Sequence, residues 1–460
     1  MAAQSPLSAL LALLTSSVQT LESAYAKQGL SYPSLDAPFA PSPLDTDAEL
    51  NNIARLAVAS AAQIIATIRG PLETIQETST GAYGAAALSL IVDTHVANII
   101  KEAGDDDQGV HISEIAAKAQ VPADSLGRLL RYLSTRHIFR EVKPDTFANN
   151  RVSSTLIKKH TLDEIKAKPT IEYEGSTAAA FVGHTTDEGL QGAAAISSWV
   201  KSLHKNYATP FNVGNHVDTD IFHWFETQEY RARRFHIAAT GSATDRFPPT
   251  IFTGGYDWAS LPKDSIVVDV GASMGSVTLT LIKEFPHLKY ILQDLEKVVK
   301  YDAPKYWEAQ MPSALTDGRV TFQAIDFFEA QPVKNAAVYF MRAIIHDWPD
   351  EKAKQIMKVV RDAAGPNSKL VVFDAIMPYA CEYTGPFAEA VAPIKAPYPL
   401  LANLGLGLGG FVTLVDIQML NLLNGKERTV GEFIELGKQS GWKLESVKPG
   451  MMASIVYSAA

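Results

Sequence analysis

Short runs of β-branched and aromatic residues alternate with amphipathic stretches along the second half of the chain, from Ser265 onward. Strands separated by helices in this way are typical of a parallel, doubly wound α/β sheet. Two later apolar runs, Lys443–Val447 and Ile455–Tyr457, predict an antiparallel pair of strands at one edge. The pattern therefore predicts seven strands, mostly parallel: these two and the runs SIVVDV, YILQD, RVTFQAID, AVYFMR and KLVVFDAI.

The first eighty residues follow a helical period instead. Apolar residues step by three or four through Leu7–Leu21, and a second apolar stripe runs through Ile53–Ile68. A proline-rich linker, Pro38–Pro43, separates the two stripes, and Thr46-x-x-Glu49 has the spacing of a capping box that opens the second helix. Since the second stripe has nothing to pack against within its own segment, it needs another domain or another subunit.

Residues 81–160 combine two short helices with a pair of short strands. Glu114–Lys118 and Leu126–Leu133 have helical spacing, and Phe139–Val142 and Thr146–Ala148 have the composition of strands. This order of elements predicts a winged helix. The apolar face of Leu126–Leu133 has no evident partner in the chain, so we expect it to contribute to a dimer interface. Residues 161–250 are helical again and rich in aromatic side chains, so we expect them to connect the winged helix to the sheet.

A winged helix can bind DNA or can serve as a packing module. The first function would use Arg128 and Arg131 on the second helix. The chain carries 41 Lys and Arg against 50 Asp and Glu, a net charge of −9, and no wider basic patch surrounds the two arginines. Because binding to nucleic acid depends on phosphate neutralisation, the charge balance favours the packing module and predicts no nucleic-acid partner.

Cysteine content and apolar segments bear on the compartment. Cys381 is the single cysteine, which excludes a disulfide framework and a cysteine-based zinc cluster and indicates a reducing, cytoplasmic location. No basic residue precedes Lys27, so the apolar start lacks the positive segment of a signal peptide. Ala396–Val415 is uncharged, but its prolines and glycines favour a loop that enters a helix near Phe411 over a membrane span. We expect no membrane partner.

The first strand of the sheet runs into a glycine turn and then an apolar helix. The segment Val267–Gly275 reads VVDVGASMG, and Asp294 ends the next strand, where a carboxylate can hold two ribose hydroxyls. These features fit NAD and S-adenosylmethionine. The dinucleotide pattern G-x-G-x-x-G is absent, since only Gly271 and Gly275 are glycines here, which disfavours NAD.

Two later strands end in further side chains that could bind a ligand or take part in catalysis. Asp326 and Phe327 end the third strand, where an acid and an aromatic ring can bind an adenine. The fourth strand ends at Arg342 and leads into His346. Ligands of open α/β sheets bind outside the carboxyl ends of the strands, so we expect these ends to converge on one pocket.

With these motifs, the chain resembles a class I methyltransferase of the plant-type O-methyltransferase family, and its fungal branch in particular. The resemblance covers residues 85–460, and the most specific motif is HDWPDE at His346–Glu351. It implies a Rossmann-like methyltransferase domain over 251–460, connecting helices that contribute to the acceptor pocket over 161–250, a winged-helix dimerisation domain over 81–160 and an N-terminal helical extension over 1–80. It implies a homodimer as well.

The resemblance also implies which residues hold the cofactor, S-adenosylmethionine, and its product S-adenosylhomocysteine. The family's glycine loop, D-V-G-G-G-x-G, is matched by the segment DVGASMG, in which alanine and serine replace two glycines. Residue by residue, the implied cofactor contacts are Asp269, Gly271, Ser273, Gly275, Asp294, Leu295, Asp326, Phe327 and Arg342.

His346 matches the family's general base. A phenol with a pKa of about 10 is mostly neutral at pH 7, and an imidazole with an ordinary pKa of about 6.5 can accept its proton. Asp374, at the end of the fifth strand, matches an acid that would orient the imidazole and stabilise its charged form. Two glutamates compete for the third position: Glu427 matches the family's second acid, whereas Glu432 stands at capping-box spacing from Thr429. We assign Glu427 to catalysis.

The predicted activity is metal-independent O-methylation of a small aromatic compound, with a phenolic hydroxyl as the acceptor. Family matching places Phe235, Met419, Asn421 and Trp199 near that acceptor. Three alternatives stay open: a pericyclase that keeps the fold and uses the sulfonium as a fixed charge, a winged-helix DNA-binding regulator, and an NAD-dependent enzyme.

Overall fold

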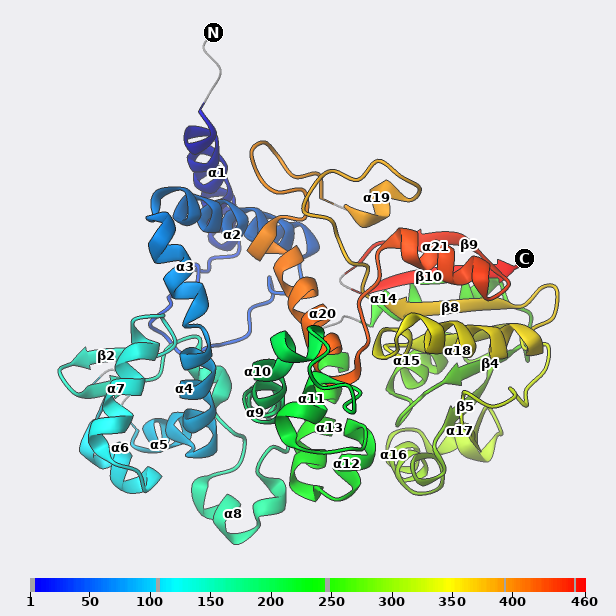
Figure 1. The fold of residues 1–460 in the computed structure, drawn as a ribbon, viewed down its shortest axis with the longest axis horizontal. Helices are drawn as coiled ribbons and strands as arrows, with labels where there is room; N and C mark the ends of the chain where they lie inside the picture. Colours follow the sequence, from blue (N-terminus) through cyan, green and yellow to red (C-terminus); the bar gives the residue numbers. More distant parts are fainter. Residues whose placement is uncertain (1–4, 105–107, 245–248, 393, 451) are drawn as a thin grey trace. The chain divides into compact units, whose positions relative to one another are not determined.

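A computed structural model describes residues 5–104, 108–244, 249–392, 394–450 and 452–460 (Figure 1). The chain divides into two compact units, Met1–Ala243 and Thr244–Ala460, which we call the N-terminal and C-terminal units. Each is described by itself.

The N-terminal unit begins with α1 (Pro6–Lys27) and α2 (Ala48–Ile68), as the two apolar stripes predict. A third helix, α3 (Pro71–Ser79), follows α2 and was not predicted. The predicted cap of α2 is wrong by one residue. Asp47, and not Thr46, is the N-cap, and its carboxylate accepts a hydrogen bond from the backbone N–H of Leu50 at 2.9 Å. Aspartate ranks at least as high as threonine at this position, so the helix begins at Ala48.

The predicted winged-helix elements are present. The helices are α4 (Ala82–Asp93), α5 (Val96–Glu102), α6 (Ile112–Ala119) and α7 (Ala123–Ser134). The strands β1 (Val110–His111), β2 (Arg140–Lys143) and β3 (Thr146–Ala148) form an antiparallel sheet in the order β1-β3-β2. The apolar side of α7 was expected to lack a partner within the chain, and this is wrong: Leu126, Leu130 and Leu133 are fully buried in the core of the unit.

Arg131, considered above for DNA binding, is engaged in ion pairs. Its Nη2 lies 2.7 Å from Oε1 of Glu141 and 2.8 Å from Oδ1 of Asp145. Two carboxylates thus neutralise the positive charge with which Arg131 would bind a DNA phosphate, and this weighs against the DNA-binding alternative.

Two of the remaining helices of the N-terminal unit, α9 (Thr177–Thr186) and α13 (Glu229–Thr244), add side chains to the same core, and several buried side chains of these later helices are charged. Arg234 is almost fully buried, pairs with Asp187 at 2.7 Å and contacts Glu188. The helices are α8 (Leu162–Ala167), α9 (Thr177–Thr186), α10 (Glu188–Val200), α11 (Pro210–Asn215), α12 (Ile221–Glu226) and α13 (Glu229–Thr244), with short 3-10 turns at Ser153–Leu156 and Pro169–Ile171.

The C-terminal unit is built on one seven-stranded sheet in the order β6-β5-β4-β7-β8-β10-β9. The first five strands of this order are parallel, and β10 is antiparallel to both of its neighbours, so the predicted antiparallel edge pair is confirmed. The strands are β4 (Ile266–Val270), β5 (Lys289–Asp294), β6 (Val320–Ala324), β7 (Val338–Arg342), β8 (Lys369–Asp374), β9 (Trp442–Lys448) and β10 (Ala453–Ala459).

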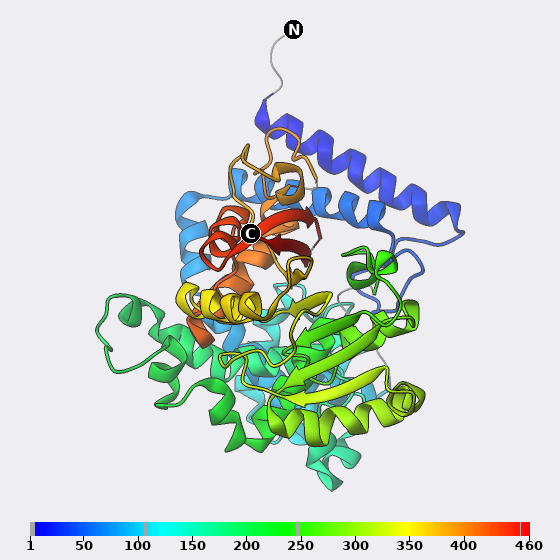
Figure 2. The same cartoon turned by 90° about the vertical axis from the view of Figure 1, so that its right-hand side faces the viewer.

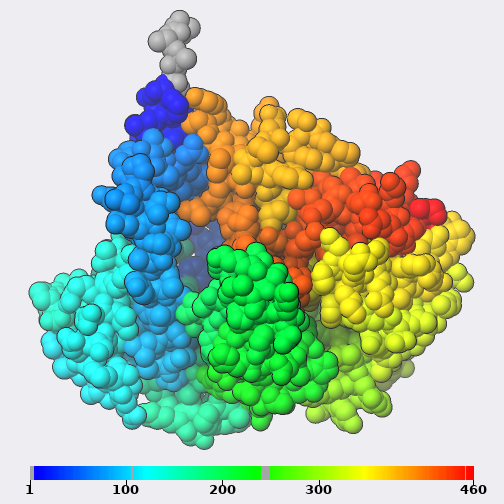
Figure 3. All heavy atoms as spheres, in the orientation of Figure 1, coloured from blue at the N-terminus to red at the C-terminus, as the bar shows by residue number. Residues whose placement is uncertain are grey.

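Helices cover both faces of this sheet (Figures 1 and 2). Side chains alternate along a strand, so the two sides of β4 pack on different faces of the sheet. Val268 and Val270 pack on the face covered by α18 (Asp350–Ala363) and α21 (Val430–Gln439). Val267 packs on the face covered by α15 (Ser276–Glu284) and α16 (Ala303–Gln310). On the surface in Figure 3, α18 and α21 lie side by side. The helices are α14 (Thr250–Thr253), α15 (Ser276–Glu284), α16 (Ala303–Gln310), α17 (Pro312–Thr316), α18 (Asp350–Ala363), α19 (Ala388–Val391), α20 (Gly409–Leu423) and α21 (Val430–Gln439), with single turns at Trp258–Ser260, Val298–Asp302, Ile345–Asp347 and Gly405–Gly407.

The uncharged segment near residue 400 contains the predicted loop and then helix α20, which begins at Gly409. In the described part of the chain, no single helix is long and apolar enough to cross a membrane. Two sharply bent helix pairs, α2 with α3 and α4 with α5, have sufficient length and apolar composition when each pair is taken together.

Candidate active site

The carboxyl ends of five parallel strands bring the candidate residues to one edge of the sheet. Asp269 and the glycine turn lie at the end of β4, Asp294 ends β5, Arg342 ends β7 and Asp374 ends β8. The chain crosses from one half of the sheet to the other between β4 and β7, which are neighbours. This switch point is where open α/β sheets form their ligand crevice.

The turn after β4 depends on its two glycines. Gly271 and Gly275 have φ values of 76° and 78°, in the left-handed region, and a Cβ atom at Gly271 would overlap the side chain of Ile344. Ser273, at one of the positions where the family pattern has glycine, also lies in the left-handed region at φ 51°. Its N–H donates to Oδ2 of Asp294 at 2.7 Å, and this hydrogen bond stabilises a conformation that serine rarely adopts.

Two carboxylates flank this turn. The second oxygen of Asp294, Oδ1, accepts the N–H of Leu295 at 2.8 Å, and the pKa of Asp294 is raised because burial outweighs its two hydrogen bonds. Asp269 is buried and accepts a hydrogen bond from the Thr278 hydroxyl at 2.6 Å. Burial raises the pKa of Asp269 to about 7. The Leu295 side chain itself is exposed.

Asp326 and Phe327 follow β6 and lie in the loop after it, two and three residues beyond its last residue, Ala324. Oδ1 of Asp326 accepts the N–H of Phe328 at 2.9 Å. The ring of Phe327 contacts those of Phe328 and Trp348, with centroids 5.1 and 6.0 Å apart. The loop thus presents a fixed carboxylate beside a cluster of aromatic rings.

Arg342 ends β7, and the Nε atom of its half-buried side chain is shielded from solvent. Its Nε has no hydrogen-bond partner among the described residues, which leaves a donor for a ligand. Burial lowers the pKa of Arg342, and nearby Asp374, Asp269 and Asp347 oppose that shift.

His346 lies in the single turn Ile345–Asp347 that follows β7. Its Nδ1 lies 2.6 Å from Oε1 of Glu427, and its Nε2 lies 3.4 Å from Oδ1 of Asp347. Asp347 belongs to the HDWPDE motif, and no role was predicted for it. Its position next to the expected base was the signal that could have found it.

The surroundings of His346 change its proton affinity from the ordinary value used above. Burial favours the neutral ring, but the charges of Asp347 and Glu427, the Glu427 hydrogen bond and the charge of Asp374 together outweigh burial and raise the pKa of His346 to about 10. Burial in turn raises the pKa of Asp347 to about 6 and that of Asp374 to about 7, while the charge of His346 opposes both shifts.

The expected role of Asp374 as the residue that orients the imidazole is wrong in this structure. Neither of its carboxylate oxygens has a hydrogen-bond partner among the described residues, so Asp374 acts on His346 through its charge alone. The side chain of Asp374 is shorter than that of Glu427, and it is the longer Glu427 that accepts the hydrogen bond of the His346 ring.

The two competing glutamates occupy different surroundings. Glu427 is buried against His346, whereas Glu432 forms the predicted capping box at the start of α21. The Thr429 hydroxyl accepts the N–H of Glu432 at 3.3 Å, and Oε2 of Glu432 accepts the N–H of Thr429 at 2.8 Å. The prediction that Glu432 caps a helix is confirmed.

The four expected acceptor residues are divided between the units. Met419 and Asn421 are buried on α20 in the C-terminal unit. Phe235 and Trp199 belong to the N-terminal unit, where Phe235 packs against the rings of His184 and Phe225, and Nε1 of Trp199 donates to the carbonyl of Tyr207 at 3.0 Å. The structure describes each pair only within its own unit.

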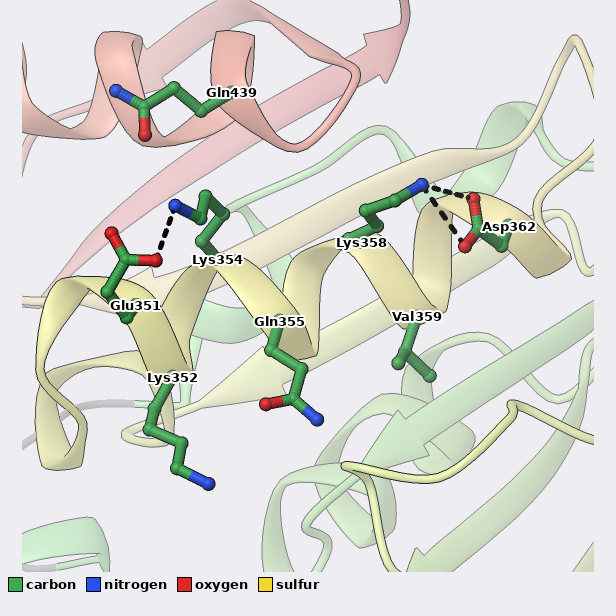
Figure 4. Close-up of a pocket in the computed structure, with 8 residues that line it drawn as sticks. All are labelled: Glu351, Lys352, Lys354, Gln355, Lys358, Val359, Asp362 and Gln439. Atoms are coloured by element: carbon green, nitrogen blue, oxygen red, sulfur yellow. Dashed lines mark hydrogen bonds and ion pairs between the residues drawn. The ribbon is translucent and has the colours of Figure 1, made fainter.

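Two other features do not add to the site. Among the described residues, no group of three His, Cys, Asp or Glu side chains could hold a metal ion. Figure 4 shows a surface hollow along α18, where Glu351 pairs with Lys354 at 2.6 Å and Lys358 with Asp362 at 2.9 Å. It shares no residue with the cluster around His346, and four of its five charged side chains are paired with one another.

The fold is that of a class I methyltransferase, and comparisons with known proteins identify the family. The family model of the O-methyltransferase domain matches residues 256–388, and that of the O-methyltransferase dimerisation domain matches residues 76–159. 4-O-methyltransferase 1 of Phanerochaete chrysosporium is 34% identical over 458 residues, which cover 96% of each chain. The chain belongs to the O-methyltransferase family, as its motifs predicted.

Solved structures support the same fold. The mitomycin 7-O-methyltransferase MmcR has a TM-score of 0.63 at 21% identity, over 87% of this chain and 100% of that one. A pericyclic reaction enzyme has the same TM-score and identity over 97% of this chain and 99% of that one. At this identity the likeness concerns the fold, which is therefore shared by proteins that catalyse different reactions.

Proposed function

We propose that this protein transfers the methyl group of S-adenosylmethionine to a phenolic hydroxyl of a small aromatic compound, with His346 as the general base. The observation that carries the proposal is the 2.6 Å hydrogen bond between His346 and Glu427, beside Asp347 and Asp374. A histidine surrounded by three carboxylates at the ligand edge of a sheet is arranged to take up a proton.

The residues present fit the cofactor. The close packing of Gly271 holds the turn after β4 in a conformation that leaves its backbone free to approach a ligand. The fixed carboxylate of Asp294 would bind the ribose hydroxyls, the loop of Asp326 and Phe327 would bind the adenine, and the free Nε donor of Arg342 would bind a polar group of the cofactor. When bound, S-adenosylmethionine supplies an electrophilic methyl group on a sulfonium.

The hydrogen bond to Glu427 decides which nitrogen of His346 reacts. A carboxylate accepts a proton from Nδ1–H, so the lone pair of the neutral ring lies on Nε2. In the proposed step, Nε2 takes the proton of the phenol, and the phenol oxygen would bond to the methyl group as the bond between the methyl group and the sulfonium breaks. The bonding pair would stay on sulfur, and S-adenosylhomocysteine would leave. Glu427, Asp347 and Asp374 stabilise the imidazolium that results.

The raised pKa of His346 suits a phenol. A phenol has a pKa of about 10, and a base with a pKa of about 10 can take its proton with little loss of free energy. An ordinary imidazole would accept that proton about three orders of magnitude less favourably. The same shift leaves most of His346 protonated at pH 7, so the rate should rise as the pH increases from 7 toward the His346 pKa of about 10.

The acceptor pocket and the subunit arrangement are part of the proposal. Met419 and Asn421, both buried on α20, would contact the acceptor. Phe235 and Trp199 stay predictions from the family resemblance. The dimerisation-domain match over residues 76–159 supports a homodimer.

The experiment is incubation of the purified protein with S-adenosylmethionine and a panel of phenols, followed by mass spectrometry. The proposal expects one acceptor to gain the mass of a methylene group while S-adenosylhomocysteine appears in equal amount. Conversion of a compound without change in mass, and without consumption of the cofactor, would instead establish the pericyclase alternative. No turnover of any phenol would contradict the proposed acceptor class.

A further inference from the structure

Arg428 directly follows Glu427, and the guanidinium of Arg428 binds the backbone of the turn that carries His346. Its side chain is 1% exposed. Nη1 donates to the carbonyl of Ile345 at 2.8 Å, and Nη2 donates to the carbonyl of Trp348 at 2.8 Å. One rigid group thus holds the backbone on both sides of His346.

Asp350 fixes the guanidinium in turn. Its Oδ1 accepts hydrogen bonds from Nε of Arg428 at 3.1 Å and from Nη2 at 2.9 Å. Its Oδ2 lies 2.9 Å from Nζ of Lys426, which also bonds to Glu432 at 2.7 Å. Asp350 therefore connects the start of α18 to both neighbours of Glu427.

The backbone of residues 425–428, which we call the clamp segment, lies against the same turn. The N–H of Lys426 donates to the carbonyl of His346 at 2.9 Å, and a Cβ atom at Gly425 would overlap that carbonyl oxygen. The N–H of Glu427 donates to Oδ1 of Asp416 at 2.8 Å. The clamp segment has little freedom to move relative to His346.

We propose that Arg428 is a positioning residue for the reaction: it fixes the His346 turn and the Glu427 carboxylate relative to each other without touching cofactor or acceptor. Nothing in the assignment of base and acids requires this residue. The proposal rests on the proposed function, because it assumes that the His346–Glu427 pair is the base.

The substitution Arg428→Lys separates the effect of the guanidinium's shape from the effect of its charge. Arg428→Lys keeps the positive charge that acts on Asp374, but an ammonium cannot reach the carbonyls of Ile345 and Trp348 together with Asp350 as the planar fork does. The charged groups that face His346, namely Glu427, Asp347 and Asp374, and Arg342 behind them, are all unchanged. A shift in the titration of His346 would then report a change in its geometry.

Arg361 provides a matched control in the same unit. Its Nε donates to the carbonyl of Gly441 at 2.9 Å, so it too is an arginine that holds backbone, but it has no contact with the His346 turn. Arg361→Lys is expected to lower the melting temperature and to leave the titration of His346 unchanged.

The experiment titrates His346 by NMR in protein saturated with S-adenosylhomocysteine, using isotope-labelled histidine, and measures kcat and KM separately. In Arg428→Lys we expect the His346 titration to move to lower pH, kcat to fall about 10- to 100-fold, as expected for a small displacement of reacting groups, and the Kd for S-adenosylhomocysteine to stay within about twofold. Asp350→Asn should shift the titration in the same direction by a smaller amount, since it loosens the same guanidinium.

An unchanged titration and kcat in folded Arg428→Lys would overturn the proposal. If that variant does not fold, an unchanged titration in Asp350→Asn would overturn it, and a shift there would support it. The NMR measurement needs no turnover. If the wild-type protein methylates no phenol, the proposed function fails while the positional role of Arg428 is still decided by the titration.

Discussion

At His346, carboxylates approach both ring nitrogens, Glu427 at 2.6 Å from Nδ1 and Asp347 at 3.4 Å from Nε2. Because the charged ring is stabilised from two sides and also by Asp374, its proton affinity departs from that of a free imidazole. This residue-level feature makes the account testable through pH.

Glu427→Gln removes one of these charges and keeps the size of the side chain. The pKa of His346 should fall, since a neutral amide stabilises the imidazolium less than a carboxylate does. The rising limb of the pH–rate profile should move to lower pH, and the maximal rate should fall. Glu432→Gln is the control, because Glu432 has no contact with the ring. A rising limb that stays in place in Glu427→Gln would contradict the assignment.

Matching of motifs predicted which residues gather around His346 but not how they interact. The roles expected for Asp374 and Glu427 were similar, and the structure separates them: Glu427 makes the hydrogen bond, and Asp374 contributes charge only. The hydrogen bonds of Arg428 to the His346 turn and to Asp350 were also not predicted from the sequence. They join residues more than seventy positions apart, so no local pattern in the sequence encodes them.

At the scale of elements, strands were the most predictable feature. The runs of β-branched residues are buried on both faces of the sheet. Because a strand buried on both faces needs apolar side chains at nearly every position, such strands can be recognised in the sequence. Helix starts were less certain, because neighbouring polar residues compete for the cap, as Asp47 does with Thr46 at α2. The capping box of α21 was predicted correctly because Thr429 and Glu432 satisfy both of its hydrogen bonds.

The cap of α21 gives a prediction opposite to that for Glu427. Glu432→Ala should cost ~0.5–2 kcal/mol in the free energy of unfolding, the usual range for loss of a cap. The rate per folded molecule should stay close to wild type. Urea denaturation measures the free energy of unfolding, and kinetics measure the rate. Thr429→Ala, which removes the other side chain of the capping box, should lower the stability and keep the rate as Glu432→Ala does. A Glu432 variant that is stable but inactive would exchange the roles of the two glutamates.

At the scale of the molecule, apolar side chains remain exposed on the N-terminal helices. Ile65 and Ile68 of α2 and Leu72 and Ile75 of α3 are all exposed, next to the segment that matches the dimerisation domain. Leu126–Leu133 was expected to contribute to the same interface, but its buried residues pack inside their own unit. Exposed apolar groups of this kind often mark a protein–protein interface.

We therefore predict a homodimer that uses α2 and α3. Light scattering should give a mass twice the 49.9 kDa of one chain at micromolar concentration. Ile68→Asp combined with Ile75→Asp should shift the mass toward the monomer, because buried unpaired charges destabilise an interface. A double change at the exposed residues Leu406 and Leu414, outside these helices, is the control. A wild-type monomer would reject the prediction.

The most direct test of the account is the separation of binding from transfer at His346. In His346→Ala, calorimetry should give an affinity for S-adenosylhomocysteine close to that of the wild type, since His346 is not among the proposed cofactor contacts. Methyl transfer to an acceptor that the wild type uses should fall by ~10²–10⁴, the range for loss of a general base. A transfer rate within a few-fold of wild type, with cofactor binding intact, would show that the phenol needs no base from this chain and would contradict the central claim.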